Sequence, residues 1–268
     1  MTQQNPAPKT HGMKKWQKGV LIAVGIILVL VIGSLGYLRT QTYGPSQEAA
    51  KVSQTAKETD YGLLFDAEKI DTNKADTDET AATKTAADGP TVVFYPGALV
   101  EPESYSIWAQ KVATAGYPVA IVRFPLNLAV LEGNAAEKVD VGDQGYVIGG
   151  HSLGGVMASR YAAAHQTNQL KGVYFMASYP DEKGALNKTS LPVLSLTGSR
   201  DGVLKWDAWR SAKQYLPAST VYEQLEGGNH AGFGSYGNQK GDNTATVSDA
   251  RQQDWIAQQM IQWLAKLK

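Results

Sequence analysis

One serine lies in a run of glycines that is typical of a catalytic nucleophile. A short β-prone stretch at residues 146–148 leads into G-H-S-L-G, from Gly150 to Gly154, with Ser152 at its centre. We expect a sharp strand-to-helix turn here, because the residues two before and two after the serine have no side chain to clash with a strained backbone. Such a turn lifts the Ser152 hydroxyl clear of a sheet and turns the N–H groups of the following helix toward a developing oxyanion.

A serine nucleophile needs a general base, and one of the four histidines is well placed for this role. His11 precedes an apolar span, His151 is the neighbour of the serine, and His165 falls in the helix expected after the turn. His230 lies in the glycine-rich stretch G-G-N-H-A-G, directly after a β-prone run at residues 220–225. Since a loop at the end of a strand suits a mobile general base, His230 is the predicted base.

Asp201 is the predicted carboxylate that holds this base and stabilises its charged form. It lies in T-G-S-R-D-G, at the carboxyl end of an apolar run at residues 191–197 where a strand is expected. Asp181 and Glu182 follow the preceding predicted strand, and Asp207 lies further along the chain. The position at the end of the strand favours Asp201, and Asp181 stays open as the alternative.

Residues 91–268 resemble the α/β-hydrolase superfamily of serine hydrolases. They carry the G-H-S-L-G elbow, the G-S-R-D-G acid loop and the G-N-H-A-G-F histidine loop of that superfamily. The longer stretches Y-P-G-A-L-V-E-P-E-S-Y and G-G-H-S-L-G-G-V-M-A are similar to a bacterial branch that is often described only as α/β hydrolase. The resemblance implies a reaction class and leaves the substrate open.

A further segment of the sequence resembles the loop that forms the oxyanion hole in this superfamily. The sequence F-Y-P-G-A-L is similar to the loop that follows the third strand in this superfamily, where most members have His-Gly and this chain has Pro96-Gly97. The resemblance implies that the backbone N–H groups of Ala98 and Leu153 bind the oxyanion together.

The elements that must position these residues alternate along the chain, which indicates a mostly parallel central sheet with helices on both faces. Strands are expected at residues 91–95, 118–123, 146–148, 170–176, 191–197 and 220–225, and helices at residues 102–115, 153–165, 205–215 and 247–268. This order agrees with the α/β-hydrolase fold that the resemblance implies.

No large lid domain is expected over the site, because residues 179–190 between two predicted strands leave room for little more than a turn. The site should therefore be open, with its shape set by the oxyanion loop, by residues 124–134 and by residues 231–243. Three aromatic side chains either line the site or pack in the core: Tyr105, Phe233 and Tyr236.

An uncharged, mostly aliphatic run covers residues 20–38. At ~1.5 Å per residue it matches the thickness of one bilayer core, so we expect a transmembrane signal anchor. Lysines without acidic residues precede it, which predicts a cytoplasmic N-terminus at residues 1–19 and a catalytic domain outside the cell. The alternative is a cleaved signal peptide and a secreted enzyme, although the apolar run is longer than the usual ~7–15 residues.

The stretch between this run and the catalytic region is rich in Thr, Ala, Lys, Asp and Glu, as exposed turns or a tether would be. A short polar helix fits residues 46–57, and residues 61–65 are typical of an early strand. We therefore expect a tether at residues 39–57 and a hydrolase domain at residues 58–268.

Composition narrows the possible functions. The 268 residues have a formal net charge of +0 and no basic stripe, which argues against nucleic acid as a partner. With Cys 0, disulfides, thiolate metal sites and a cysteine nucleophile are excluded. We expect no metal and no organic cofactor, and a small-molecule or lipid-like ester as substrate.

The expected reaction is transfer of an acyl group to water through an acyl-enzyme on Ser152. Two other functions stay open. An acyltransferase would use the same residues to hand the acyl group to a cell-envelope acceptor. A non-catalytic binding module on a hydrolase scaffold is less favoured, since nucleophile, base and acid are all readable in this chain.

Overall fold

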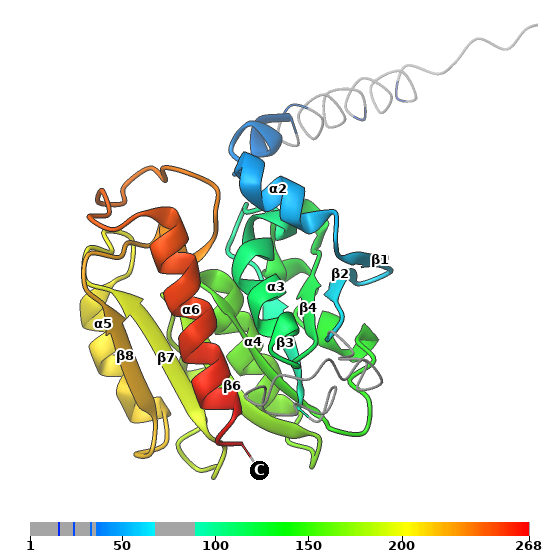
Figure 1. Ribbon diagram of the computed structural model, residues 1–268, viewed down its shortest axis with the longest axis vertical. Coiled ribbons are helices and arrows are strands. Elements are labelled where there is room, and N and C mark those ends of the chain that lie inside the picture. Colours follow the sequence, from blue (N-terminus) through cyan, green and yellow to red (C-terminus); the bar gives the residue numbers. More distant parts are fainter. Residues whose placement is uncertain (1–15, 17–23, 25–32, 34–35, 68–88, 268) are drawn as a thin grey trace, which may run out of the picture. The chain divides into compact units, whose positions relative to one another are not determined.

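The computed structural model describes residues 36–67 and 89–267, and the single positions 16, 24 and 33 (Figure 1). The chain divides into two compact units, Met1–Gln41 and Thr42–Lys268, and every predicted site residue belongs to the second. Most of the apolar run at residues 20–38 lies outside the described residues. Among the residues that are described, no helix has the length and apolar character needed to cross a membrane.

The second unit is built on one sheet, which has eight strands in the described part of the chain. The strand order is β1-β2-β4-β3-β5-β6-β7-β8, with β3 to β8 parallel and β1 and β2 antiparallel to their neighbours. The strands are β1 (Lys57–Thr59), β2 (Gly62–Phe65), β3 (Thr91–Tyr95), β4 (Val119–Val122), β5 (Tyr146–His151), β6 (Leu170–Met176), β7 (Val193–Gly198) and β8 (Val221–Leu225). The predicted, mostly parallel sheet is therefore confirmed.

Helices cover both faces of this sheet, as Figure 1 shows. Alternate strand residues face opposite sides, so Phe94 packs with α3 and α6, whereas Val93 packs with α4 on the other face. The α-helices with described bounds are α2 (Gln47–Ser53), α3 (Ser106–Thr114), α4 (Leu153–Ala164), α5 (Trp206–Ala212) and α6 (Asp249–Leu264). The helix predicted at residues 102–115 is divided between α3 and the 3₁₀ turn that precedes it.

Short 3₁₀ turns form parts of the connections between these helices and strands. They are η1 (Pro102–Tyr105), η2 (Pro125–Asn127), η3 (Ala129–Leu131), η4 (Ala135–Lys138), η5 (Glu182–Gly184), η6 (Lys213–Tyr215) and η7 (Ala231–Phe233). Between β6 and β7 the chain forms only η5, so there is no lid domain at the place where the sequence predicted none.

Residues 42–57, which include the stretch predicted as a tether, pack on the rest of this unit, and the unit begins at Thr42. The Tyr43 and Tyr236 rings are 5.4 Å apart, and the Ser46 N–H donates to the Ser235 carbonyl at 2.7 Å. In α2, Ala49 is completely buried. These contacts were not predictable, because the stretch is mostly polar and only a few small and aromatic residues make them.

Candidate active site

Ser152 lies at the turn between β5 and α4, in a backbone conformation with φ of 52° and ψ of −123°. A non-glycine residue rarely adopts a positive φ, and the neighbouring glycines make this turn possible. A Cβ atom on Gly150 would lie 2.4 Å from the Tyr95 carbonyl oxygen, and one on Gly154 only 2.0 Å from it. The strand, turn and helix predicted around Ser152 are all present, and the serine is partly exposed.

His230 and Asp201 form a buried hydrogen-bonded pair. The loop after β8 holds the histidine and the loop after β7 holds the aspartate, and the two side chains meet with His230 Nδ1 donating to Asp201 Oδ2 at 2.8 Å. The other carboxylate oxygen accepts the Val203 and Leu204 N–H groups at 2.9 and 2.7 Å. Since a carboxylate only accepts, Nδ1 carries a proton, and in the neutral tautomer Nε2 keeps its lone pair.

This Nε2 atom is buried and, among the described residues, has no hydrogen-bond partner, Ser152 Oγ included. Catalytic hydrogen bonds are often long before substrate binds, so an unpaired base is compatible with a serine nucleophile nearby. The geometry leaves one imidazole nitrogen fixed by a carboxylate and the other free to accept a proton.

The other carboxylates and histidines considered from the sequence have different partners. Asp181 accepts hydrogen bonds from Arg160 Nε at 3.0 and 3.2 Å, and these bonds are the main cause of the lowered pKa of Asp181. Asp207 is exposed and pairs with Arg210. His165 Nδ1 contacts the carbonyl oxygen one turn earlier in α4. Glu182 is exposed in η5, and His11 lies outside the described residues.

The loop from Pro96 to Leu99 lies beside the serine, because β3 and β5 are neighbours and Tyr95 pairs with Gly150. Leu99 has a φ of 59°, and its N–H donates to the Asn127 carbonyl at 2.8 Å. Within the described residues, the Ala98 N–H donates no hydrogen bond, and neither does the N–H of Leu153, the first residue of α4. Both expected oxyanion donors are thus unpaired and partly exposed.

A buried aromatic cluster lies below this loop. The Tyr105 hydroxyl is 3.0 Å from the Gly97 N–H nitrogen and 3.0 Å from His151 Nδ1. The His151 ring lies 4.5 Å from the His230 ring and stacks on Phe233 at 5.9 Å. Burial, and then the electrostatic interaction with the neighbouring His230, lower the pKa of His151 well below its usual value, so the His151 imidazole is neutral.

Three aromatic residues were expected either to line the site or to pack in the core. The structure places them in the core, since Tyr105 and Phe233 are 0% exposed and Tyr236 is 8% exposed. His151, which the sequence presents only as the neighbour of the serine, is also buried. No local pattern marks its contact with Tyr105, because the two residues are 46 positions apart.

Asp242 joins the two loops that hold His230 and Asp201. Its Oδ1 accepts the Gly202 N–H at 2.9 Å, and its Oδ2 accepts the Ala231 N–H at 2.8 Å. Each donor directly follows one member of the buried pair. The sequence placed this residue in the loop at 231–243 that shapes the site, but its role as a clamp depends on the fold.

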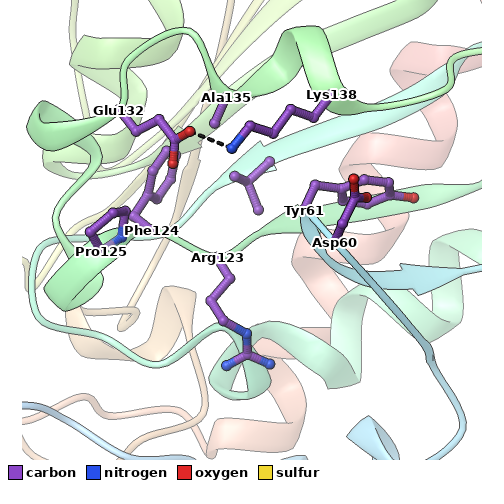
Figure 2. A pocket seen from close by; sticks show the side chains of 9 residues that line it. Asp60, Tyr61, Arg123, Phe124, Pro125, Glu132, Ala135 and Lys138 are labelled. Carbon is purple, nitrogen blue, oxygen red and sulfur yellow. Dashed lines mark hydrogen bonds and ion pairs between the residues drawn. The ribbon is translucent and has the colours of Figure 1, made fainter.

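A cavity of about 270 Å³ opens at the carboxyl end of β4 (Figure 2), and it is separate from the predicted site residues. An ion pair between Glu132 and Lys138 spans part of it. Its lining consists of Asp60, Tyr61, Val122, Arg123, Phe124, Pro125, Glu132, Ala135 and Lys138. Among the described residues, no group of three or more His, Cys, Asp or Glu side chains could hold a metal ion.

Comparisons with known proteins agree with this architecture. The sequence profile described as Alpha/beta hydrolase family matches residues 91–254. A search of curated protein sequences gives no significant match. The fold is similar to that of a "predicted CIB-like hydrolase" from Thermoplasma acidophilum, at 16% identity and a TM-score of 0.50, over 69% of this chain and 90% of that one. The esterase domain of a Rhodothermus marinus protein matches at 11% identity and a TM-score of 0.48, over 75% and 90%.

Proposed function

Because the chain belongs to the alpha/beta hydrolase family, we propose that it is a serine hydrolase that cleaves a carboxylic ester through an acyl-enzyme on Ser152. The observation that carries this proposal is the buried hydrogen bond from His230 to Asp201, with the His230 ring 4.5 Å from that of His151, the residue directly before the strained, partly exposed Ser152. An imidazole with one nitrogen fixed by a carboxylate and the other unpaired is the arrangement that general-base catalysis needs.

The reaction has two symmetrical halves. His230 Nε2 takes the proton of the Ser152 hydroxyl while Oγ attacks the ester carbonyl carbon, and the carbonyl oxygen becomes an oxyanion. The N–H groups of Ala98 and Leu153 stabilise that oxyanion. His230 then returns the proton to the leaving alkoxide, which departs as the alcohol and leaves an acyl group on the serine.

Water completes the cycle by the same chemistry. His230 removes a proton from a water molecule, the hydroxide oxygen attacks the acyl carbon, and the second tetrahedral intermediate collapses with proton return to Ser152 Oγ. Asp201 holds the imidazole in one tautomer throughout and stabilises its transient positive charge. The products are a carboxylic acid and an alcohol.

We further propose that residues 20–38 anchor the enzyme in the membrane uncleaved, with the catalytic unit on the outer side. The support comes from the sequence, namely an apolar run of membrane-spanning length with lysines before it. In that location, the enzyme would act on esters that are present outside the cell.

One experiment tests both proposals. A membrane-impermeant fluorophosphonate is applied to intact cells that express the full chain, and to lysed cells, for the native protein and for Ser152→Ala. We expect native labelling in intact cells, no labelling of Ser152→Ala, and a fall of about 10⁴- to 10⁶-fold in ester hydrolysis by the variant. The variant should melt close to the native temperature, since one partly exposed hydroxyl contributes little to stability.

The outcomes separate the two proposals. Ester hydrolysis at the native rate in Ser152→Ala contradicts the serine-hydrolase function. Labelling that appears only after lysis contradicts the outward orientation and leaves the chemistry intact. Product analysis with and without an added alcohol distinguishes hydrolysis from acyl transfer to an acceptor.

A further inference from the structure

We propose that Tyr105 is a positioning residue that ties the oxyanion loop to the nucleophile turn. Its hydroxyl joins Gly97 of the loop to His151, the residue before Ser152, and so fixes the Pro96–Gly97 peptide, which directly precedes the peptide that presents the Ala98 N–H. The catalytic consequence rests on the proposed function, whereas the tether itself is a property of the fold.

The direction of the two hydrogen bonds follows from the chemistry of their partners. The Gly97 N–H can only donate, so the Tyr105 oxygen accepts it at 3.0 Å. The hydroxyl proton is then available for His151 Nδ1, also at 3.0 Å. Burial raises the pKa of Tyr105 and is the main cause of the lowered pKa of His151, so both groups stay neutral and the bond persists.

The space around Gly97 shows how closely the loop is held. A Cβ atom at this position would lie 2.8 Å from His151 Nδ1 and 3.2 Å from the Tyr105 hydroxyl oxygen. The glycine therefore allows the loop backbone to approach both side chains. Pro96, which precedes it, has no N–H to offer, so the Gly97 N–H is the first donor of the loop.

Ala98 lies between two fixed points. Gly97 is held by Tyr105, and Leu99 is held through its N–H bond to the Asn127 carbonyl at 2.8 Å. Asn127 belongs to a partly exposed turn with a φ of 55°, whereas Tyr105 is 0% exposed. The buried side of the loop is thus the stiffer attachment of the Ala98 peptide.

Removal of the hydroxyl leaves the Gly97 N–H and His151 Nδ1 buried without partners. The loop can satisfy this N–H by turning the Pro96–Gly97 peptide toward water. This movement at Gly97 displaces the adjoining Gly97–Ala98 peptide and loosens the Val100 N–H bond to the Gly97 carbonyl. A shift of about 1 Å in a group that contacts the transition state can cost about 100-fold in rate.

The test compares Tyr105→Phe with Tyr174→Phe in the full chain. Tyr174 is a matched control, because it is also 0% exposed and its hydroxyl donates one hydrogen bond, to the Val93 carbonyl in the sheet at 2.9 Å. Two measurements are made on each variant. The first is kcat and KM with a p-nitrophenyl ester, and the second is amide hydrogen exchange at Leu99 and Val100.

For Tyr105→Phe we expect kcat to fall by about 10- to 100-fold with little change in KM, since the loss falls on the transition state. Exchange at Leu99 and Val100 should become faster, although their N–H groups bond to Asn127 and Gly97 carbonyls and not to Tyr105. Tyr174→Phe should show neither effect.

Unchanged exchange at Leu99 and Val100 in Tyr105→Phe overturns the proposal whatever the activity. An equal fall in kcat for both tyrosine variants also overturns it, because loss of any buried hydroxyl would then explain the result. If the native chain hydrolyses no ester, the proposed function fails, and the exchange measurement still decides on the tether.

A second pair of variants tests the same tether if Tyr105→Phe does not fold. In His151→Asn the amide oxygen stands near the position of Nδ1 and accepts the Tyr105 hydroxyl, whereas the side chain of His151→Leu cannot accept it. Exchange at Leu99 and Val100 should be faster in His151→Leu than in His151→Asn. Equal exchange in these two variants contradicts the tether.

Discussion

The two oxygens of the Asp201 carboxylate perform different tasks. Oδ1 accepts two backbone N–H groups of its own loop, which holds the carboxylate plane in place, while Oδ2 faces His230. Asp181 also has a full set of partners, but they are Arg160 and the backbone of its own turn. At the scale of single residues, the contact with His230 therefore favours Asp201 over Asp181 as the proposed acid.

Asp201→Asn should lower kcat by about 10³- to 10⁴-fold, because the amide no longer enforces the proton on His230 Nδ1 or stabilises the imidazolium. Asp181→Asn is the control, since it makes the same chemical change at the carboxylate that follows β6 and pairs with Arg160. It should leave kcat near the native value. Steady-state ester hydrolysis by both variants gives the comparison, and a larger loss in Asp181→Asn would show that the acid lies after β6.

The candidate residues differ in how far they can be read from the sequence. Ser152, His230 and Asp201 each lie in a short local pattern at the end of a β-prone run, so the order of the elements is enough to select them. Tyr105 and His151 have no such pattern. Their proposed roles depend on a contact between η1 and the nucleophile turn. These segments are far apart in the sequence, so the contact cannot be predicted from a single sequence.

At the scale of elements, the loops after β7 and β8 act as one unit because Asp242 joins them. Its carboxylate accepts an N–H from Gly202 and another from Ala231, the residues that follow Asp201 and His230. A carboxylate that bridges two backbone donors restrains both loops at a single point. Asp242 thereby helps to fix the distance between Asp201 and His230, although it contacts neither side chain directly.

Asp242→Ala should lower kcat by about 10-fold, because the acid and histidine loops then move independently. Asp207→Ala serves as the control, since this exposed aspartate lies in α5 and contacts only Arg210 among the interactions described for it. Thermal unfolding with ester kinetics separates the two possible effects. A drop in melting temperature at native kcat would mean that Asp242 contributes to stability alone.

The elements themselves were predictable where their hydrophobic pattern is long and buried. The helix α4 and the strands β3, β4, β6, β7 and β8 lie within two residues of their expected places, whereas β5 starts as expected and runs on through the glycines to His151. The turns after β4 were not predictable, since Leu126 and Asn127 take positive φ values of 55° without a glycine to signal them. Neither was the antiparallel β1, because its residues are mostly exposed.

At the scale of the whole molecule, residues 42–57 reach the histidine side of the site. Ser46 Oγ lies 2.7 Å from Ser235 Oγ, and the Ser235 N–H donates to the Ser104 carbonyl at 2.6 Å. Ser104 directly precedes Tyr105 in η1. Residues 42–57, which follow the proposed membrane anchor, are thus linked through Ser235 to η1, the turn that contains Tyr105.

A chain that begins at Thr42 should therefore be more stable than one that begins at residue 58. The shorter chain loses the buried Ala49 and the Tyr43–Tyr236 contact and exposes the face of α3 that α2 covers, at a cost of about 2–4 kcal/mol in the free energy of unfolding. Urea denaturation of the two chains measures this difference, and ester kinetics at low denaturant show whether the oxyanion loop is affected as well. Equal midpoints and equal kcat would show that residues 42–57 act as a tether only and contribute neither to the stability nor to the activity of the rest of the unit.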